Sequence, residues 1–475
     1  MAASGRALLG HTRLAIVDVT GGGQPMRGED ERFTLVCNGE IYNHGRLRDG
    51  LGSQHRFGSR SDSEVVLHLF EELGAGCVHE LDGMFAFLVT DGARFAAARD
   101  PFGIKPLYVG WNGSASALWF ASEFKALAAH CEGFKALPPG SYLTESGDVR
   151  QWFAPRWASE IGAQASTSPD EMRGRLEAAV VKRLMSDVPL GVFLSGGLDS
   201  SIVASLACQH MGSVETFSVG LAGASDLDAA RCVASALGTK HRECVYTMQD
   251  VVEVLDQVIY HLESYDPALI RSAVPCYLLA RLAAESVKVV LTGEGADELF
   301  GGYSYFSGVD DPAEFHQECV SLLSNLHSMN LQRVDRMTMA HGLEGRVPFL
   351  DAEFAGWSMG LDPRLKLWSA GGLEKRLLRE AFGAALPREI VERKKLEFSA
   401  GSGVEALLAD YAEQQVTDRD LMGAHAQFPI DPPMTKEELL YRRLFDGFFP
   451  GEWPQANVQK WRHSVAAGRR HGMPS

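Results

Sequence analysis

The chain has 475 residues, of which 45% are hydrophobic, and a formal net charge of −16 at pH 7. This length and composition are typical of a globular protein with two domains. The acidic balance argues against nucleic acid as a partner, since binding to a phosphate backbone needs a basic surface. No segment has the apolar length that a membrane span requires, and the start has no signal-peptide core, so we expect a cytoplasmic protein.

The cysteines and the end of the chain carry little chemical signal. The eight cysteines are scattered without a CxxC pair, and such thiols in a large unsecreted chain are usually buried and reduced. The Arg- and His-rich stretch from Lys460 to His471 is expected to be solvated, and residues 452–475 as a whole are taken as a C-terminal tail.

Residues 7 to about 150 alternate short apolar runs with turns marked by Gly and Asp, which predicts an antiparallel sheet. Asp91-Gly92 between two such runs predicts a hairpin, and the spacing from Ser63 to Leu73 predicts a helix on the sheet. The expected strands include Thr34–Cys37, Met84–Thr90, Arg94–Ala98 and Ala117–Ala121.

Four strings in this region are more specific than their surroundings. They are Gly10-His-Thr-Arg-Leu-Ala-Ile-Val-Asp18, Asn38-Gly-Glu-Ile-Tyr-Asn43, Arg60-Ser-Asp-Ser-Glu64 and Arg99-Asp-Pro-Phe-Gly-Ile-Lys-Pro-Leu-Tyr108. Together they resemble the N-terminal-nucleophile glutaminase domain of class II glutamine amidotransferases, an antiparallel sandwich. A lone Asn-Gly pair would be only a turn, but four motifs in order favour the resemblance.

The resemblance implies a pocket for glutamine within residues 1–155. Arg13 and Asp62 would hold the α-carboxylate and α-amino groups, with the backbone of Ile16 and with Glu40 nearby. The resemblance also implies that Asn38 and Gly39 form an oxyanion hole, with donors aimed at the charge that develops in the tetrahedral intermediate.

The nucleophile of that family is missing from the sequence as it stands. In the family it is a cysteine directly after the initiator methionine, whereas position 2 here is Ala2 and the lead-in to the Gly-His-x-Arg-Leu motif is short. Cys37 lies in an expected strand with no base beside it. We therefore assign no nucleophilic cysteine, expect free ammonia as the nitrogen source of this chain, and expect the true start to lie upstream.

After a linker from Pro155 to Pro169, apolar strands alternate with helical stretches over residues 170–451. This rhythm predicts a doubly wound parallel sheet, whose ligands sit beyond the carboxyl ends of the strands. The expected strands are Leu190–Leu194, Glu215–Val219, Glu243–Thr247 and Val287–Leu291.

The first of these strands leads into Ser195-Gly-Gly-Leu-Asp-Ser-Ser201, and an amphipathic stretch from Leu198 to Met211 predicts a helix. A strand, a glycine turn and a helix direct free backbone N–H groups at an anion, although a Gly-Gly pair alone would favour an ordinary connection. The full string is similar to the pyrophosphate loop of N-type ATP pyrophosphatases. The ATP-binding residues that this resemblance implies are Phe193, Leu194, Ser195, Gly196, Gly197, Asp199, Ser200, Val219, Gly220, Thr292 and Gly293.

A second glycine-rich loop follows a later strand and carries three carboxylates, Glu294, Asp297 and Glu298. Carboxylates near a triphosphate need a divalent cation between them, which implies Mg²⁺; the alternative is that they only cap a helix N-terminus. The loop resembles the second signature of asparagine synthetases. That resemblance implies that Asp199 and Asp297 hold the metal and that Glu294 is the general base for ammonia.

Later motifs add basic candidates. Arg333 and Arg346 are candidates for polarising an acyl-adenylate or holding a carboxylate, and either could equally belong to a structural ion pair. Lys395, in Arg393-Lys-Lys-Leu-Glu-Phe-Ser399, is the candidate cation for charge on the phosphate. The family often has Asp after that Ser, where this chain has Ala400.

Taken together, residues from about Gly10 to Pro450 resemble the bacterial type of glutamine-hydrolysing asparagine synthetases. The implied reaction is ATP-dependent amidation of aspartate through a β-aspartyl-AMP intermediate, with ATP and Mg²⁺, with glutamine or ammonia as donor, and with a homodimer as the candidate assembly. Three alternatives stay open: an amidotransferase acting on another carboxylate, an enzyme like β-lactam synthetase, and a degenerate non-catalytic paralogue.

Overall fold

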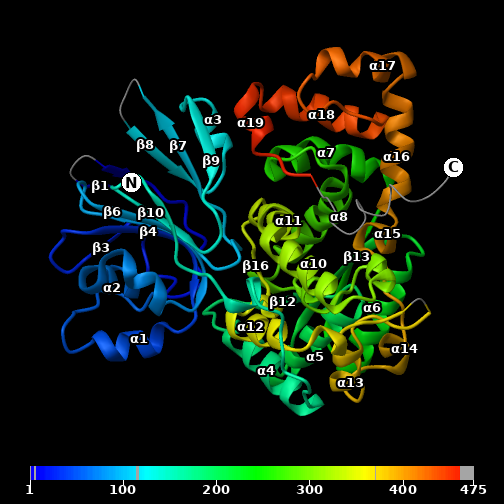
Figure 1. Ribbon diagram of the computed structural model, residues 1–475, viewed down its shortest axis with the longest axis horizontal. Helices are drawn as coiled ribbons and strands as arrows, with labels where there is room; N and C mark the ends of the chain where they lie inside the picture. Colours follow the sequence, from blue (N-terminus) through cyan, green and yellow to red (C-terminus); the bar gives the residue numbers. More distant parts are fainter. Residues whose placement is uncertain (1, 5–6, 114–116, 370, 461–475) are drawn as a thin grey trace. The chain divides into compact units, whose positions relative to one another are not determined.

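A computed structural model describes residues 2–4, 7–113, 117–369 and 371–460 of the chain (Figure 1). The chain divides into two compact units. Unit 1 contains Met1–Glu160, Lys182–Pro189 and Asp351–Glu353, and unit 2 contains the rest. Most of the expected tail, residues 461–475, lies outside the described residues. The described part of the tail contains a short helix at Glu452–Ala456, and its Lys460 forms an ion pair with Asp431.

Unit 1 is built mainly from short strands. Its elements are β1 Ala2–Ser4, β2 Ala7–Leu9, β3 Met26–Arg27, β4 Thr34–Ile41, α1 His44–Leu51, α2 Glu64–Leu73, η1 Gly74–Glu80, β5 Gly83–Thr90, β6 Phe95–Arg99, β7 Tyr108–Asn112, β8 Ala117–Ala121, α3 Lys125–Ala128, β9 Gly133–Ala136, β10 Ser141–Thr144, β11 Val149–Gln151 and η2 Arg156–Ala158.

Six strands of unit 1 form one antiparallel sheet in the order β11-β10-β6-β5-β4-β3, and three more form the sheet β8-β7-β9. One face of the large sheet packs with α1, α2 and η1 around apolar residues that include Phe85 and Phe87. The other face packs against Leu107 and Val109, at the start of the small sheet. The antiparallel sandwich expected for this region is confirmed, as is the hairpin at Asp91-Gly92, where Thr90 pairs with Phe95.

Strand β4 is longer than the sequence predicted, because the apolar run ends at Cys37 while the backbone pairing with β5 continues to Ile41. The Asn38-Gly39 pair therefore lies within a strand, and the turn considered for it is wrong. Gly39 has φ 129°, and a Cβ there would overlap the Met84 carbonyl, so the two strands approach too closely for any other residue.

Unit 2 alternates strands and helices. The elements that follow the linker are α4 Pro169–Lys182, β12 Leu190–Phe193, α5 Leu198–Met211, β13 Glu215–Leu221, α6 Ser225–Leu237, β14 Lys240–Tyr246, α7 Met248–Leu262, α8 Pro267–Ala283, β15 Val289–Leu291, α9 Ala296–Phe300, η3 Ser304–Gly308, α10 Pro312–Asn325, η4 Leu326–Ser328, α11 Asn330–Met339, β16 Glu344–Arg346, η5 Pro348–Leu350, α12 Ala352–Gly360, η6 Pro363–Leu365, α13 Arg376–Phe382, α14 Arg388–Val391, α15 Phe398–Ser402, α16 Val404–Gln415, α17 Asp418–Gln427, α18 Lys436–Phe448 and α19 Glu452–Ala456.

The sheet of unit 2 is parallel throughout, with the strand order β14-β13-β12-β15-β16. The chain builds outward from β12 to β14 and then returns to place β15 on the other side of β12. The order reverses between β12 and β15, which is the switch point where a crevice opens at the carboxyl ends of such sheets. The parallel sheet expected from the sequence is confirmed, and β16 is a fifth strand that the sequence analysis did not include.

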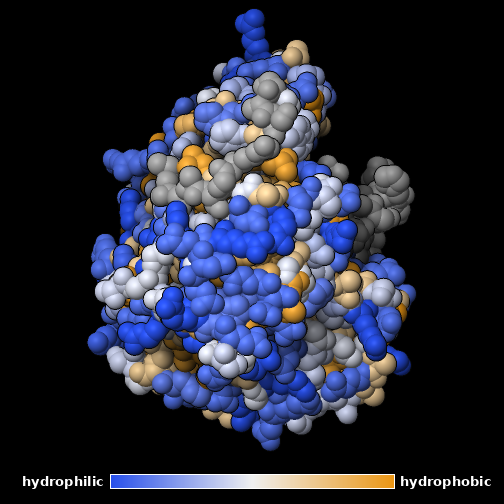
Figure 2. All heavy atoms as spheres, turned by 90° about the vertical axis from the view of Figure 1, so that its left-hand side faces the viewer, coloured by the Kyte–Doolittle hydropathy of each residue, from blue (hydrophilic) through white to orange (hydrophobic). Residues whose placement is uncertain are grey.

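Four of the eight cysteines are buried, as expected, and the other four are only partly buried. All eight cysteines are described, and none forms a disulfide bond. Among the described residues, no helix is both long and apolar enough to cross a membrane. The face in Figure 2 is mainly hydrophilic, with hydrophobic residues in small separate groups.

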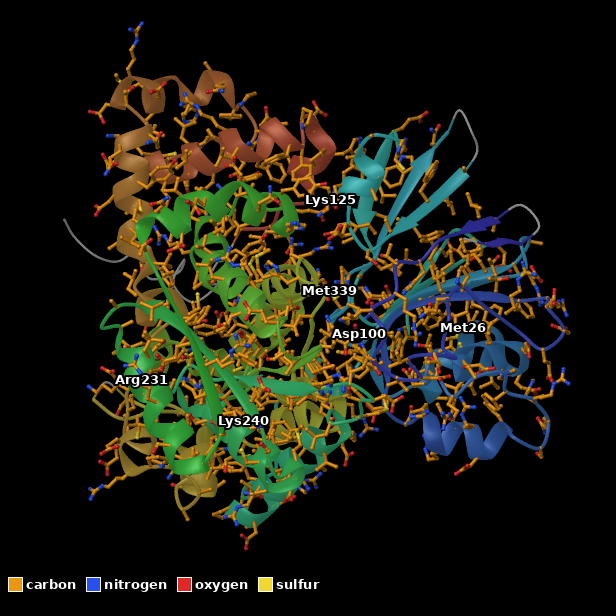
Figure 3. All side chains as sticks on the ribbon, turned by 180° about the vertical axis from the view of Figure 1, so that it is seen from behind. Met26, Asp100, Lys125, Arg231, Lys240 and Met339 are labelled. Carbon is orange, nitrogen blue, oxygen red and sulfur yellow. The ribbon has the colours of Figure 1, made fainter. Side chains whose placement is uncertain are left out.

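Arg99 and Asp100 hold the loop between β6 and β7 through hydrogen bonds to its backbone; Figure 3 labels Asp100. The buried Arg99 guanidinium donates to the carbonyls of Gly103, Lys105 and Leu137, at 2.8–2.9 Å. The buried Asp100 carboxylate accepts from the N–H groups of Phe85 and of three residues in the loop. Burial raises the pKa of Asp100 although these donors favour its charged form. This motif therefore organises backbone in unit 1.

Replacing Asp100 by Ala should destabilise unit 1, because at least three buried N–H groups lose their acceptor. We expect a loss on the order of 3 kcal/mol, seen as more than about a hundredfold faster hydrogen exchange in β5 and β6. Asp148→Ala, in an exposed turn, is the matched control and should exchange like the wild type. Unchanged exchange in Asp100→Ala would show that the carboxylate does not hold the loop.

Candidate active site

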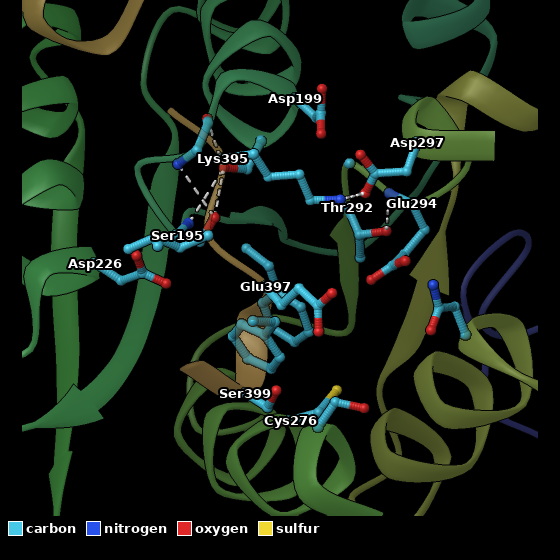
Figure 4. Close-up of a pocket in the computed structure, with 18 of the residues that line it drawn as sticks. Ser195, Asp199, Asp226, Cys276, Thr292, Glu294, Asp297, Lys395, Glu397 and Ser399 are labelled. Atoms are coloured by element: carbon cyan, nitrogen blue, oxygen red, sulfur yellow. Dashed lines mark hydrogen bonds and ion pairs between the residues drawn. The ribbon is translucent and has the colours of Figure 1, made fainter. Parts of the chain in front are cut away.

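A cavity of about 360 Å³ opens at the carboxyl ends of β12, β13 and β15 in unit 2 (Figure 4). Its size and its mixture of apolar walls with a few polar groups are typical of a small-molecule site. Most of the residues predicted for ATP, metal and catalysis line it: Phe193, Leu194, Ser195, Gly197, Asp199, Ser200, Val219, Thr292, Gly293, Glu294, Asp297, Arg333 and Lys395.

The loop after β12 forms the predicted anion site at the start of α5. Gly197 occupies the N-cap position without a side-chain cap, so the first N–H groups of a 14-residue helix remain available. The hydroxyls of Ser195 and Ser200 lie 3.1 Å apart, and the Ser200 and Ser201 hydroxyls also donate to the Gly197 carbonyl. The loop is shaped by its own side chains and presents N–H and O–H donors together.

The loop after β15 lies directly against this one. A Cβ on Gly293 would come within 2.8 Å of the Asp199 Cβ and 2.9 Å of the Ser200 nitrogen. Only glycine permits this approach, which follows from the adjacency of β12 and β15 in the sheet. The approach brings the carboxylates of the two loops into one cluster.

Two lysines connect those carboxylates. The Lys375 ammonium contacts Asp199 Oδ2 and lies 2.5 Å from Asp297 Oδ1, and the Lys395 ammonium contacts the other oxygen of Asp297. Lys395 also lies 4.4 Å from the centre of the Tyr303 ring. Figure 4 shows Lys395 reaching across the cavity toward Asp297. The cavity thus contains two carboxylates and two ammonium groups in direct contact.

These contacts shift the pKa values of the two carboxylates in opposite directions. Burial works to raise the pKa of Asp297, but the two lysines outweigh it and hold that pKa well below its ordinary value. Burial raises the pKa of Asp199, with Lys375 opposing and Asp297 adding to the rise. Both carboxylates raise the pKa of Lys375 although burial lowers it, so the ammonium stays charged.

The predicted base, Glu294, makes a different contact. Its carboxylate is paired with the Arg333 guanidinium, which is buried and also faces the Phe398 ring at 5.8 Å. Arg333 is therefore a cavity residue. The other candidate arginine, Arg346, is fully buried in β16 and pairs with Glu344 at 2.9 Å, so its place is the structural ion pair.

A helix N-terminus explains the acidic loop only in part, because Asp297 and Glu298 lie in the first turn of α9 whereas Glu294 precedes the helix. The N-cap of α9 is Gly295, and no side chain caps that helix. Glu298 accepts a hydrogen bond from the Tyr303 hydroxyl at 2.5 Å, and burial next to Asp297 raises its pKa to about 7. Of the three predicted acids, Asp297 and Glu294 line the cavity, while Glu298 is buried and does not line it.

Several cavity residues were missed by the sequence analysis. Lys375 stands alone in Leu373-Glu-Lys-Arg, where only its left-handed backbone, φ 59°, is unusual. Arg393 donates to Asp226 at 2.7 Å and to the Gly196 carbonyl at 3.3 Å, and it too lines the cavity. The predicted residues Gly196 and Gly220 do not line it.

The predicted glutamine residues of unit 1 are engaged with neighbouring backbone. The Arg13 guanidinium donates to the carbonyls of residues 17, 18 and 19, and the Ile16 carbonyl accepts from the Asp187 N–H. The buried Asp62 carboxylate accepts from the Ile41 N–H at 2.7 Å. Asn38, Gly39 and Glu40 follow one another along β4, with the Asn38 amide 3.5 Å from the Ser122 hydroxyl. Their role toward glutamine stays a prediction.

Two family models match the chain. The model described as asparagine synthase matches residues 171–311 and 307–467, and the glutamine amidotransferase domain matches residues 1–143. These matches cover both units and agree with the fold of each.

Several plant proteins are similar over nearly the whole chain. Asparagine synthetase [glutamine-hydrolyzing] 3 of Arabidopsis thaliana is 45% identical over 472 residues, covering 95% of this chain and 81% of that protein. Asparagine synthetase [glutamine-hydrolyzing] 2 of the same plant is 44% identical, covering 95% and 81%. The enzyme of Triphysaria versicolor is 44% identical, covering 94% and 80%. Whether the chain is of the bacterial type stays a prediction. The asparagine synthase family model matches more than half of the chain, and the relatives above are 44–45% identical to it over nearly its whole length. The chain therefore belongs to the family of glutamine-hydrolysing asparagine synthetases.

Proposed function

We propose that this protein is an asparagine synthetase, a ligase that uses ATP to convert aspartate to asparagine with nitrogen from glutamine or ammonia. The observation that supports it best is the convergence of two glycine-rich loops at one switch point. That convergence joins an uncapped helix N-terminus, two carboxylates and two lysines in one cavity. Family membership supports the same assignment.

The residues present fit a divalent cation. The Oδ1 atom of Asp199 is buried and accepts no hydrogen bond from the described residues, and Asp297 shares the Lys375 ammonium with it. Carboxylate oxygens are the ligands that Mg²⁺ prefers, so Asp199 and Asp297 would hold it, and Lys375 occupies the position between them. When bound, Mg²⁺ neutralises charge on the triphosphate and on the pyrophosphate that leaves.

In the first half-reaction, a side-chain oxygen of aspartate attacks the α-phosphate of ATP. The bond from that phosphorus to the bridging oxygen breaks, which gives β-aspartyl-AMP and pyrophosphate. The N–H groups at the start of α5 and the hydroxyls of Ser195 and Ser200 bind the phosphates. Lys395 stabilises the negative charge that builds up during transfer. Activation is needed because a free carboxylate has no adequate leaving group.

In the second half-reaction, ammonia attacks the activated carbonyl and AMP leaves with the electrons of the C–O bond. The attacking nitrogen must lose a proton, and we assign its acceptance to Glu294, a carboxylate that lines the cavity. Arg333 holds Glu294 in position through their ion pair. The cavity therefore supplies a phosphate site and a base on separate loops.

Three expectations stay predictions beside this function. They are the domain boundaries at residues 155, 170 and 451, a homodimer, and a cytoplasmic location. Eight cysteines without a disulfide bond are compatible with the reducing conditions of the cytoplasm.

Product analysis tests the proposed function and its nitrogen source together. The full chain is incubated with ATP, aspartate and Mg²⁺, with ammonium in one sample and glutamine in the other. In the ammonium sample we expect asparagine, AMP and pyrophosphate in equal amounts. Asparagine formation in the glutamine sample would show that the amidotransferase domain is active. Formation of ADP and phosphate, or AMP formation without aspartate, would contradict the proposal.

Replacing Glu294 by Gln should separate the two half-reactions. The variant keeps its shape but cannot accept a proton, so we expect asparagine formation to fall by about 10²–10⁴-fold. Aspartate-dependent exchange of pyrophosphate into ATP should persist within a few fold of wild type. Glu380→Gln, in an exposed ion pair with Arg376, is the control. Normal asparagine formation in Glu294→Gln would remove the assignment of the base.

Replacing Lys375 by Met should make thermal stability depend on Mg²⁺. Without the ammonium, two partly buried carboxylates face each other with only Lys395 beside Asp297, which costs at most about 3 kcal/mol until a cation replaces it. We expect a lowered melting temperature that Mg²⁺ alone restores in part, with little Mg²⁺ effect on wild type.

Lys366→Met is the matched control for Lys375→Met. Lys366 is also buried, faces the Phe300 ring, and has no ion pair among the described residues. Its replacement should leave the Mg²⁺ response unchanged. Equal Mg²⁺ responses in both variants would show that Asp199 and Asp297 do not form the metal site.

A further inference from the structure

Unit 1 contains a second cluster of ligand-type side chains, which the sequence analysis did not single out. One donor atom from each of Glu29, His55, His68 and Glu71 lies within 4.8 Å of the others. Glu29 follows β3, His55 lies between α1 and α2, and His68 and Glu71 lie one turn apart on α2. Three separate segments of the chain therefore meet at this point.

The separations within the cluster suit a small tetrahedral ion. His55 Nδ1 lies 3.2 Å from Glu29 Oε1 and 3.3 Å from Glu71 Oε2, and His68 Nδ1 lies 3.4 Å from the same Glu71 oxygen. Ligands at about 2.1 Å from a tetrahedral zinc ion are about 3.4 Å apart. A typical N–H···O hydrogen bond is shorter, at about 2.9 Å.

Both imidazoles are oriented as metal-bound histidines usually are. Each directs Nδ1 into the cluster and Nε2 toward a carboxylate outside it. His55 Nε2 lies 3.0 Å from Glu72 Oε1, and His68 Nε2 lies 3.7 Å from Glu64 Oε1. The Glu72 carboxylate is within hydrogen-bond distance of His55 Nε2 and fixes the tautomer and direction of that ring, whereas His68 Nε2 has no hydrogen-bond partner among the described residues.

The charges around the cluster also favour a cation. Glu29, Glu64, Glu71 and Glu72 surround two imidazoles, and the nearest arginine in these contacts, Arg48, lies 4.0 Å from Glu64. The side chain of His68 is only 1% exposed, and Glu71 Oε1 is buried without a hydrogen-bond partner. Glu64 is buried and Glu71 is partly buried, whereas Glu29 and Glu72 are exposed, so positive charge is needed chiefly beside the first two carboxylates.

We propose that Glu29, His55, His68 and Glu71 bind a zinc ion in unit 1. A set of two imidazoles and two carboxylates suits zinc, and four protein ligands leave no open position, which is characteristic of a structural site. The ion would tie the loop after β3 and the loop after α1 to α2. Asp62 lies just before α2, so the ion would also fix the segment that carries it.

Zinc titration of the full, tag-free chain tests the site independently of any enzyme activity. The protein is depleted with a chelator and titrated with Zn²⁺ against a chromogenic competitor. We expect one tightly bound equivalent, and at free zinc near 100 times Kd, about a hundredfold smaller unfolding constant. Co²⁺ in its place should give the visible absorption of a four-coordinate ion.

Variants assign the ligands. His55→Gln and Glu71→Gln each remove one donor and should abolish competitive zinc binding. Glu72→Gln removes only the carboxylate behind His55 and should weaken binding about 10–100-fold. Glu80→Gln, an exposed glutamate beyond α2, is the matched control and should bind zinc like wild type.

Three results would overturn the proposal. One is a wild-type chain that retains no zinc against the competitor, and a second is undiminished binding in both His55→Gln and Glu71→Gln. The third is stability that ignores zinc but falls as pH rises through the histidine range, which would mean that protonated imidazoles balance the carboxylates. Retained hydrogen-exchange protection of β5 and β6 in the variants reports that unit 1 is still folded, so loss of zinc binding cannot be ascribed to unfolding of the unit that carries the site.

Discussion

The contact of one buried ammonium, Lys375, with the carboxylates of Asp199 and Asp297 is the interaction on which the active site depends. Two carboxylates from neighbouring loops would repel each other in this half-buried setting, and the ammonium holds them together. Glycine at position 293 lets the loops approach closely enough for the contact. The cluster is thus stable without a metal and retains the oxygen ligands for one.

The parallel sheet explains why these groups meet. Strands β12 and β15 are adjacent although about a hundred residues separate them, because the chain reverses its direction of growth at β12. The helix N-terminus after β12 provides phosphate donors, and the loop after β15 provides the second metal ligand and the base. Activation of a carboxylate and its amination require these groups within one small volume, and the topology places them there.

Much of this arrangement was predictable from local sequence. Helix α5 has the expected bounds, Leu198–Met211, because its glycine turn is a strong signal, but the amphipathic pattern expected for it is wrong, since every residue from Ser200 to Ala207 is buried. Strand β16 was not predicted, because Glu344-Gly-Arg has the composition of a loop. Its two charged side chains are buried as an ion pair with each other, which the sequence alone does not reveal.

The missed residues depend on contacts between distant segments. Lys375 has no motif around it, and its partners lie far away along the chain. The four residues of the proposed zinc site span positions 29 to 71 without metal-type spacing, since only His68 and Glu71 share a helix. Conversely, Arg333 and Arg346 were equivalent in sequence, and only burial and partners separate the cavity residue from the structural one.

The cavity is proposed to activate a carboxylate as an acyl-adenylate, and the most direct test is whether oxygen passes from aspartate to AMP. Aspartate labelled with ¹⁸O in its side-chain carboxylate is converted with ATP and ammonium, and the AMP is examined by mass spectrometry. We predict one ¹⁸O atom in each AMP formed, with none in pyrophosphate. Unlabelled AMP, or label in inorganic phosphate accompanied by ADP, would contradict it.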